Sequence, residues 1–454
     1  MRSSIGFACG GLLFFCAAFV ACSSSDGGAG PAAGDAGADG AVLPQGDAAS
    51  SADAGVDAAD QDPNVYPAMH QPIPQVDNLG GPTIAHPRLV AVTFAGDADR
   101  DQLRAFTHGI GTSAWWHATL TQYGIADATS GVDAELPDTL SGKTTTDAEL
   151  QTFLAQQMLG GNLPAPDGQT LYLVFLPKRA RLTSGTATSC TDFGGYHSSF
   201  PARGVALDGG APDAATMDAG GDGGAGLADA LYAPLADCGG GLPERTITAA
   251  HEIAETVTDP YFSSATGWEL VSNDAWIPAG LRFGAYSSVS YGEIGDLCEG
   301  FVTTDSGFTV PRIWSNAAAR ASKDPCQPTM SPYFGAAVRT TPRIAGGKKV
   351  DGHVAVKRGE SIDVVADFFS EAALPSDVTL SVGVLDERGA FAALKALPPG
   401  VTVKLSRTKV HNGNAVVLTI AAASTAAPAS VSLSVRSSLS TGDFRDWPVV
   451  LNVL

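Results

Sequence analysis

One short segment of the chain combines residue types that could bind a metal ion and activate water. The sequence His251-Glu252-Ile-Ala-Glu255 differs by one residue from the HExxH motif of zinc metallopeptidases. Residues i and i+4 share one face of a helix, so His251 and Glu255 would point the same way. Zinc accepts imidazole nitrogen and carboxylate oxygen. The segment therefore predicts two zinc ligands, with Glu252 as the general base that activates water.

The same spacing also fits an ordinary helix whose His and Glu side chains face solvent. A motif this short arises by chance in a chain of this length often enough to matter. Glu255 in place of a second histidine also lowers the charge of the site, which weakens the activation of water. Taken alone, the motif leaves both interpretations open.

Two downstream carboxylates could complete a metal site. Glu293 and Asp296 lie in the segment Glu-Ile-Gly-Asp-Leu-Cys, beside Cys298. In zincins the third ligand is often a downstream Glu, and a nearby Asp orients a ligating His. We expect Glu293 to be the third ligand and Asp296 to orient His251. The opposite assignment, with Asp296 as the ligand and Glu293 as the orienting residue, is also open. A further alternative is that both acids lie in a surface turn and bind no metal.

A glycine-containing segment after Cys190 carries two further candidates. Tyr196 and His197 are residue types that can donate a hydrogen bond to negative charge developing on a substrate oxygen. We therefore treat them as candidate catalytic residues. A plain turn with an exposed histidine is the alternative.

The elements around these residues predict a zincin-like α+β domain over residues 63–330. Pro234 predicts that the strand at 230–235 lies at a sheet edge, since proline cannot donate to a neighbouring strand. The HEIAE helix follows and should end before Pro260. Apolar runs predict buried strands at 89–94 and 170–176, and helical patterns cover 99–106, 113–120 and 146–154.

The rest of the chain predicts an all-β accessory domain and an N-terminal anchor. Residues 331–454 contain alternating strands separated by Gly and Pro, as in an immunoglobulin-like sandwich. Residues 1–25 have the pattern of a lipoprotein signal peptide, with Cys22 as the lipidated residue. Residues 26–62, and an insertion at about 208–229, have the Ala/Gly/Asp-rich composition of disordered segments. The signal predicts a lipid anchor to a membrane and a place at the cell envelope or the extracellular surface, and Ser23 in place of Asp after Cys22 indicates the outer membrane.

Cysteine content and charge restrict the classes of partner. Cys190, Cys238, Cys298 and Cys326 remain in the exported part, where disulfides form. We favour Cys190–Cys238 and Cys298–Cys326, which close the shortest loops, although four cysteines allow three pairings. The net charge of −20 argues against nucleic acid as a partner.

Three segments resemble the exordium (phosphate-induced) protein family. Residues 113–119 (SAWWHAT) are similar to its SxWWxxT helix, residues 254–261 to its AGTVTNPF segment, and residues 293–300 to EAVSACTG. The resemblance implies an extracellular protein. Plant members, which have no established catalysis, carry Gly at the position of Glu255 and lack the His-Glu pair.

Together the sequence predicts a surface lipoprotein with a zinc-dependent, peptidase-like hydrolase domain. A peptide or a cell-surface polymer is the expected partner. The alternative is a non-catalytic adhesion or structural protein of the exordium-like family.

Overall fold

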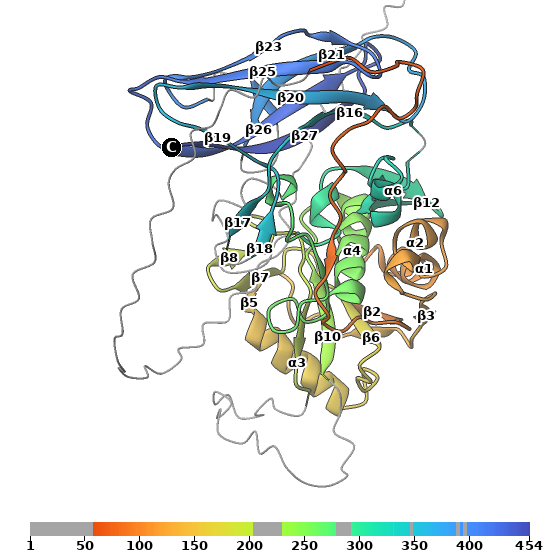
Figure 1. Cartoon of the computed structure of the whole chain (residues 1–454). Helices are drawn as coiled ribbons and strands as arrows, with labels where there is room; N and C mark the ends of the chain where they lie inside the picture. The colour runs from red at the N-terminus through yellow and green to blue at the C-terminus, as the bar shows by residue number, and fades with distance from the viewer. Residues whose placement is uncertain are drawn as a thin grey trace, which may run out of the picture.

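The computed structural model describes residues 58–202, 229–277, 292–329, 331–345, 348–386, 391–393 and 397–454. The predicted signal peptide with Cys22, most of the predicted tether and nearly all of the insertion at 208–229 lie outside these ranges. The described chain is rich in strands and has few helices. Figure 1 shows a mixed part with helices and strands, and a part built from strands alone.

A mixed sheet forms the centre of the first part. Its described strands follow the order β3-β2-β6-β10-β9, and β4 also pairs with β2. Helices cover both faces, which explains the continuous apolar runs of the central parallel strands. The strands are β2 (Arg88–Phe94), β3 (Thr129–Ser130), β4 (Ala134–Leu136), β6 (Thr170–Phe175), β9 (Ser198–Phe200) and β10 (Ala230–Leu235).

The prediction that 230–235 is an edge strand was wrong. β10 pairs in parallel with β6 on one side and antiparallel with β9 on the other. Pro234 is tolerated because β9 pairs only with residues 230–232 and ends before the proline is reached. A short neighbouring strand therefore removes the constraint on which the prediction rested.

The helices divide between the two faces of this sheet. α1 (Arg100–Ile110), α2 (Ala114–Thr119) and α4 (Gly241–Thr258) pack on the face that bears Leu89 and Ala91, whereas α3 (Asp147–Leu159) packs on the opposite face with Val90 and Val92. α6 (Asn316–Arg320) is a short helix further along the chain. The four longer helices match the predicted helical segments. The described helices include none that is both long and apolar enough to cross a membrane.

α4 carries the HEIAE motif and is buried along almost all of its 18 residues. Pro243 lies in the first turn of α4, where backbone N–H groups have no partner within the helix, so the N–H that proline lacks costs no hydrogen bond. The helix ends with Asp259, whose φ of −150° leaves α geometry because a proline follows. Because these side chains are buried, each ionisable group of α4 needs a hydrogen-bond or ion-pair partner or has to lose its charge.

The second part consists of two sheets that share one apolar core. β16 of one sheet packs against β26 and β27 of the other. The first sheet contains β16 (Phe334–Val338), β20 (Ser361–Ser370), β25 (Ala415–Ala422) and β23 (Val401–Leu405). The second contains β19 (His353–Val356), β27 (Phe444–Val453), β26 (Ala429–Ser438), β21 (Val378–Leu385), β22 (Phe391–Ala393) and β24 (Lys409–Val410).

Short paired strands complete the described elements. They are β1 (Asp77–Asn78) with β11 (Trp268–Glu269), β5 (Thr144–Thr146) with β7 (Arg181–Ser184) and β8 (Ala187–Thr188), β12 (Val302–Asp305) with β13 (Phe308–Pro311), β14 (Ile313–Trp314) with β15 (Cys326–Gln327), and β17 (Arg343–Ala345) with β18 (Lys348–Val350).

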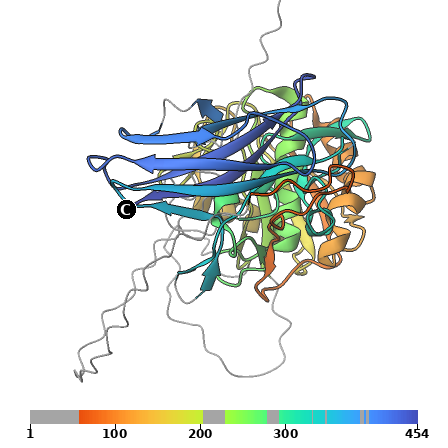
Figure 2. The ribbon, with the colours of Figure 1, turned by 45° about the horizontal axis from the view of Figure 1, so that its top comes forward.

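The two parts are joined by a continuous apolar core. Trp276 of the mixed part contacts Trp314 edge to face at 5.5 Å and Trp447 of the sandwich at 5.1 Å. Figure 2 shows the strands of the sandwich lying across the mixed part. The N-terminal stretch 58–78 runs along both, since Gln61 donates to the Gly413 carbonyl and β1 pairs with β11.

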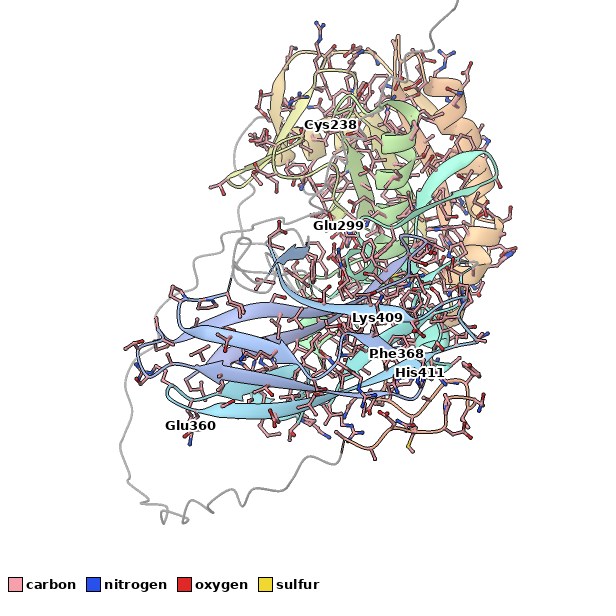
Figure 3. The ribbon with its side chains drawn as sticks, turned by 90° about the horizontal axis from the view of Figure 1, so that it is seen from above. Cys238, Glu299, Glu360, Phe368, Lys409 and His411 are labelled. Atoms are coloured by element: carbon pink, nitrogen blue, oxygen red, sulfur yellow. A yellow bond between two sulfur atoms is a disulfide. The ribbon has the colours of Figure 1, made fainter. Side chains whose placement is uncertain are left out.

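Both disulfides that the sequence favoured are present. Cys190 is bonded to Cys238, which precedes α4, and Cys298 is bonded to Cys326. Figure 3 labels Cys238 in the mixed part. The second disulfide holds the segment that carries Glu293 and Asp296 beside the rest of the mixed part.

Candidate metal centre

The last turns of α4 place three ionisable side chains at the centre of the mixed part. His251, Glu252 and Glu255 are 7%, 0% and 1% exposed. His251 Nε2 lies 3.0 Å from Glu255 Oε1, the i,i+4 relationship that the motif predicts. The interpretation as a solvated helix face does not describe this helix, because the three side chains are buried.

Asp296 approaches the same histidine from the downstream segment. It lies in the short 3₁₀ turn Asp296–Cys298, and its Oδ1 is 3.7 Å from His251 Nε2. Gly295 makes the approach possible, because a Cβ atom there would lie 2.6 Å from Glu255 Oε1 and 2.9 Å from the His251 ring. Asp296 and His251 are therefore in contact, as the sequence led us to expect.

His197 reaches the centre from the sheet, directly before β9. Its Nε2 lies 3.1 Å from the carbonyl oxygen of Asp259, at the end of α4. A carbonyl can only accept, so Nε2 carries a hydrogen. Burial alone would lower the pKa of His197, but its contact with Glu252 outweighs burial and raises the pKa, so without a cation Nδ1 also tends to carry a hydrogen. Nδ1 lies 3.6 Å from Glu252 Oε2 and 3.7 Å from Glu255 Oε2. Sequence reasoning proposed His197 as a hydrogen-bond donor, and the structure places it as a possible ligand.

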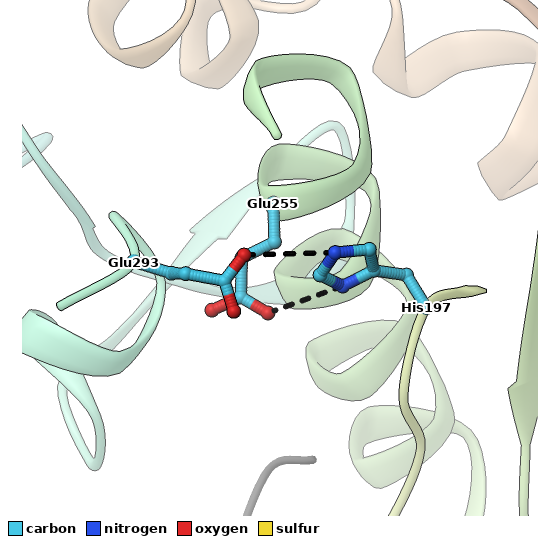
Figure 4. A group of neighbouring side chains, drawn as sticks. All are labelled: His197, Glu255 and Glu293. Atoms are coloured by element: carbon cyan, nitrogen blue, oxygen red, sulfur yellow. Dashed lines mark ion pairs between the residues drawn. The ribbon is translucent and has the colours of Figure 1, made fainter. Parts of the chain in front are cut away.

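Glu293 lies on the same side of the His197 ring as Glu255. Its Oε1 is 3.5 Å from His197 Nε2, and Figure 4 shows both carboxylates facing the edge of the ring that bears the nitrogens. Glu293 and Glu255 therefore converge as expected, but the imidazole that both of them face belongs to His197 and not to His251.

Tyr196 does not reach this centre. Its hydroxyl donates to Asp147 Oδ1 at 2.5 Å, and its side chain belongs to the core on the opposite face of the sheet from α4. Successive residues of an extended segment point to opposite faces, so only one of Tyr196 and His197 can face α4. The proposed role of Tyr196 as a catalytic donor is therefore not supported by its position.

The cluster contains more negative than positive charge. Burial raises the pKa of both Glu293 and Asp296 well above the usual value, and the nearby charge of Glu255 raises each further. Burial alone would lower the pKa of His251, but the carboxylate of Glu255 outweighs it and raises the pKa well above its usual value. Burial likewise raises the pKa of Asp259 to about 6. Groups in this arrangement bind either protons or a cation.

Several buried ligand atoms of the cluster make no hydrogen bond within the described part of the chain. They are His197 Nδ1, His251 Nε2, both carboxylate oxygens of Glu255, and Glu293 Oε1. Buried polar atoms are normally hydrogen-bonded, since one without a partner costs about 1–3 kcal/mol, and here their contacts are the ion pairs at 3.0–3.7 Å. A metal ion is the partner that imidazole nitrogens and carboxylate oxygens would share. Neighbouring ligands of a tetrahedral zinc lie about 3.3–3.6 Å apart, close to the spacings of 3.0–3.7 Å here.

A pocket lies beside the cluster, between the mixed part and the sandwich. Its volume is about 550 Å³. Asp296 and Trp276 line it from the mixed part, and Phe391, Arg436 and Phe444 line it from the sandwich. Arg436 stacks between the two phenylalanine rings at 4.1 and 4.0 Å. Asp296 thus belongs to both the buried cluster and the wall of the pocket.

Comparison with known proteins does not identify a family. No family model and no curated protein matches the chain. Among solved structures, domains 5–6 of the S-layer protein SbsC match at 14% identity over 27% of this chain and 45% of that one, with a TM-score of 0.18. The chain thus spans less than half the length of that solved chain.

Two further matches are equally distant. The BIgI domain of the beta protein from S. agalactiae, solved bound to CEACAM1, matches at 11% identity over 26% of this chain and 95% of that one, with a TM-score of 0.15. A family 123 glycoside hydrolase from Clostridium perfringens matches at 10% identity over 27% of each chain, with a TM-score of 0.19. None of these similarities is strong enough to assign a function.

Proposed function

We propose that the mixed part is a zinc-dependent hydrolase of peptidase type. His251 and Glu255 hold the ion, with Asp296 as the third ligand because it is the downstream carboxylate that contacts His251. This is the reverse of the assignment that the sequence favoured. The observation that carries the proposal is the set of buried imidazole and carboxylate atoms without hydrogen-bond partners around Glu255.

The roles of the residues follow from their positions. A zinc ion at this site would supply a Lewis acid that polarises a carbonyl and makes water acidic. Glu252 is next to His251 on α4, and its Oε2 lies 3.6 Å from His197 Nδ1, so a proton taken by Glu252 would stay near a second basic group. The pocket beside Asp296 offers aromatic rings and Arg436 to a peptide or a cell-surface polymer.

A different role also has an observation in its favour. Glu252 is completely buried among the described residues, whereas a catalytic base must reach its substrate. The rival proposal is therefore a cluster that stabilises the fold of a non-catalytic adhesion or structural protein, as the exordium resemblance implies. Such a protein would bind no zinc and cleave no peptide in its parent form, and neutralising Glu252 would change only the stability of the fold, through its contact with His197.

The environment of the protein is part of the proposal. Two disulfides fit an oxidising compartment. We place the protein at the cell envelope, attached to the outer membrane through lipid on Cys22, as an exordium-like protein with an immunoglobulin-like accessory domain.

Metal analysis and one substitution separate the two roles. We expect the purified full chain to contain stoichiometric zinc and to cleave peptides from a mixed library. Glu252→Gln should keep the zinc and lose peptide cleavage by roughly 10²- to 10⁴-fold, since it removes only the base. Glu360→Gln is the matched control, because Glu360 is an exposed residue of the sandwich (Figure 3). Absence of zinc in the parent, or unchanged cleavage by Glu252→Gln, would reject the proposal.

A further inference from the structure

The ligand atoms of the cluster fall into two groups that share one residue. One group is His251 and Glu255 with Glu252, which the proposed function keeps as the base, and the other is His197, Glu255 and Glu293. Within each group, one ligand atom from every residue lies within 4.8 Å of the others. Glu255 is the residue common to both, and it lies between the two histidines.

Glu255 offers a different oxygen to each histidine. Oε1 lies 3.0 Å from His251 Nε2, whereas Oε2 lies 3.7 Å from His197 Nδ1. Neither oxygen has a hydrogen-bond partner within the described residues. A carboxylate whose two oxygens face separate donor groups has the arrangement of a bridging ligand. We infer that the centre binds two divalent cations bridged by the carboxylate of Glu255.

The second group has the properties of a metal site in its own right. His197 is 1% exposed, its Nε2 donates to the Asp259 carbonyl, and its Nδ1 therefore faces Glu252 and Glu255, where it would bind a cation in place of a hydrogen. An outer carbonyl that orients a ligating histidine in this way is a regular feature of metal sites. Glu293 contributes a buried oxygen, Oε1, that also makes no hydrogen bond within the described part of the chain.

Charge balance favours two ions over one. Four buried carboxyl groups take part in the contacts with the two histidines: Glu252, Glu255, Glu293 and Asp296. Ionised, they carry four negative charges, which two divalent cations would neutralise, whereas with one cation two of the four carboxyl groups would have to bind protons to avoid buried negative charge. Pairs of cations about 3.5–4 Å apart are common in hydrolases, where they stabilise the attacking and leaving oxygens. The inference rests on the proposed function and specifies the composition of its site.

Manganese binding tests the inference directly. We would titrate the metal-free full chain with Mn²⁺, measuring bound metal and the electron paramagnetic resonance spectrum. The parent should bind about two equivalents with an exchange-coupled spectrum, as expected for two ions sharing one bridge. His197→Ala should bind about one, without coupling. His117→Ala is the matched control and should keep about two, since His117 is an exposed histidine paired with Asp127.

The outcomes separate this inference from the proposed function. One equivalent in the parent, or two equivalents in His197→Ala, would overturn the two-cation centre and leave the hydrolase proposal standing. No bound Mn²⁺ in the parent would also overturn the two-cation centre, while the hydrolase proposal is decided separately by the zinc content of the purified protein, because zinc binds such ligands more tightly than manganese does. Glu293→Gln provides a second test if His197→Ala does not fold: it preserves the shape of the side chain, removes a charged ligand of the second group, and should also reduce binding to about one equivalent.

Discussion

Gly295 lies directly against Glu255, so close that a Cβ atom on Gly295 would be 2.6 Å from Glu255 Oε1. Gly295→Ala should therefore push Glu255 and the neighbouring His251 ring away from their positions. Displacing oriented ligands weakens metal affinity, and we expect a loss of roughly 10- to 100-fold. Competition with a chromogenic zinc chelator would measure it.

Gly109 supplies the control for this substitution. It lies in α1, and a Cβ atom there would meet no other atom within 4 Å. Gly109→Ala should leave zinc affinity unchanged and stabilise α1 by roughly 0.5–1 kcal/mol. Equal affinities in the parent and Gly295→Ala would show that the glycine does not keep the cluster in place.

Arg245 anchors the other end of α4. Its Nη2 and Nη1 lie 2.7 and 2.9 Å from the two carboxylate oxygens of Asp97, and the Arg245 side chain is 2% exposed. Arg245→Met would leave Asp97 buried without its partner, so we expect the free energy of unfolding to fall by about 3–5 kcal/mol. Chemical denaturation with a metal chelator present would measure this independently of the metal centre.

Arg88 permits the same substitution at an exposed ion pair. It contacts Asp167 at 2.6 Å, but about half of its side chain is accessible. Arg88→Met should cost no more than about 1 kcal/mol. Similar losses for the two variants would mean that the Arg245–Asp97 pair contributes no more than a surface contact.

His70 should make stability depend on pH. It stacks on Phe369 with ring centroids 3.5 Å apart, and burial lowers the pKa of its imidazole. The folded state then binds fewer protons than the unfolded state, so its contribution is complete above about pH 6.5 and is lost as pH falls through the lowered pKa. His70→Phe keeps the stacking and removes the titration.

Denaturation at a series of pH values between about 7 and 5 would test this. The parent should lose more free energy of unfolding over this range than His70→Phe. An identical pH dependence of the two proteins would assign the acid sensitivity to other groups.

Local patterns predicted the helices and the disulfides well. The HEIAE helix forms where its apolar spacing and Pro260 indicate, and the cysteines that close the shortest loops are bonded. These features depend on residues close together in the chain. The position of the 230–235 strand was missed because it depends on β9, which lies beyond an insertion and covers only part of the neighbouring strand.

The candidate site was only partly predictable for the same reason. Spacing along α4 indicated that His251 and Glu255 meet, because a helix fixes that distance. That His197 joins Glu255 depends on antiparallel pairing of β9 with β10, the strand that leads towards α4. The buried placement of His197 next to the Asp259 carbonyl therefore follows from tertiary structure and from no local pattern.

The stretch 58–78 has a consequence for how the protein unfolds. Gln61 donates to the Gly413 carbonyl, and Asn412 of the sandwich donates to the carbonyls of Pro63 and Val65. The same stretch ends in β1, which pairs with β11 of the mixed part. If either the sandwich or the mixed part unfolded alone, backbone groups of this stretch would lose their hydrogen bonds. The stretch thus couples the two parts into one cooperative unit, with a single melting transition in place of two.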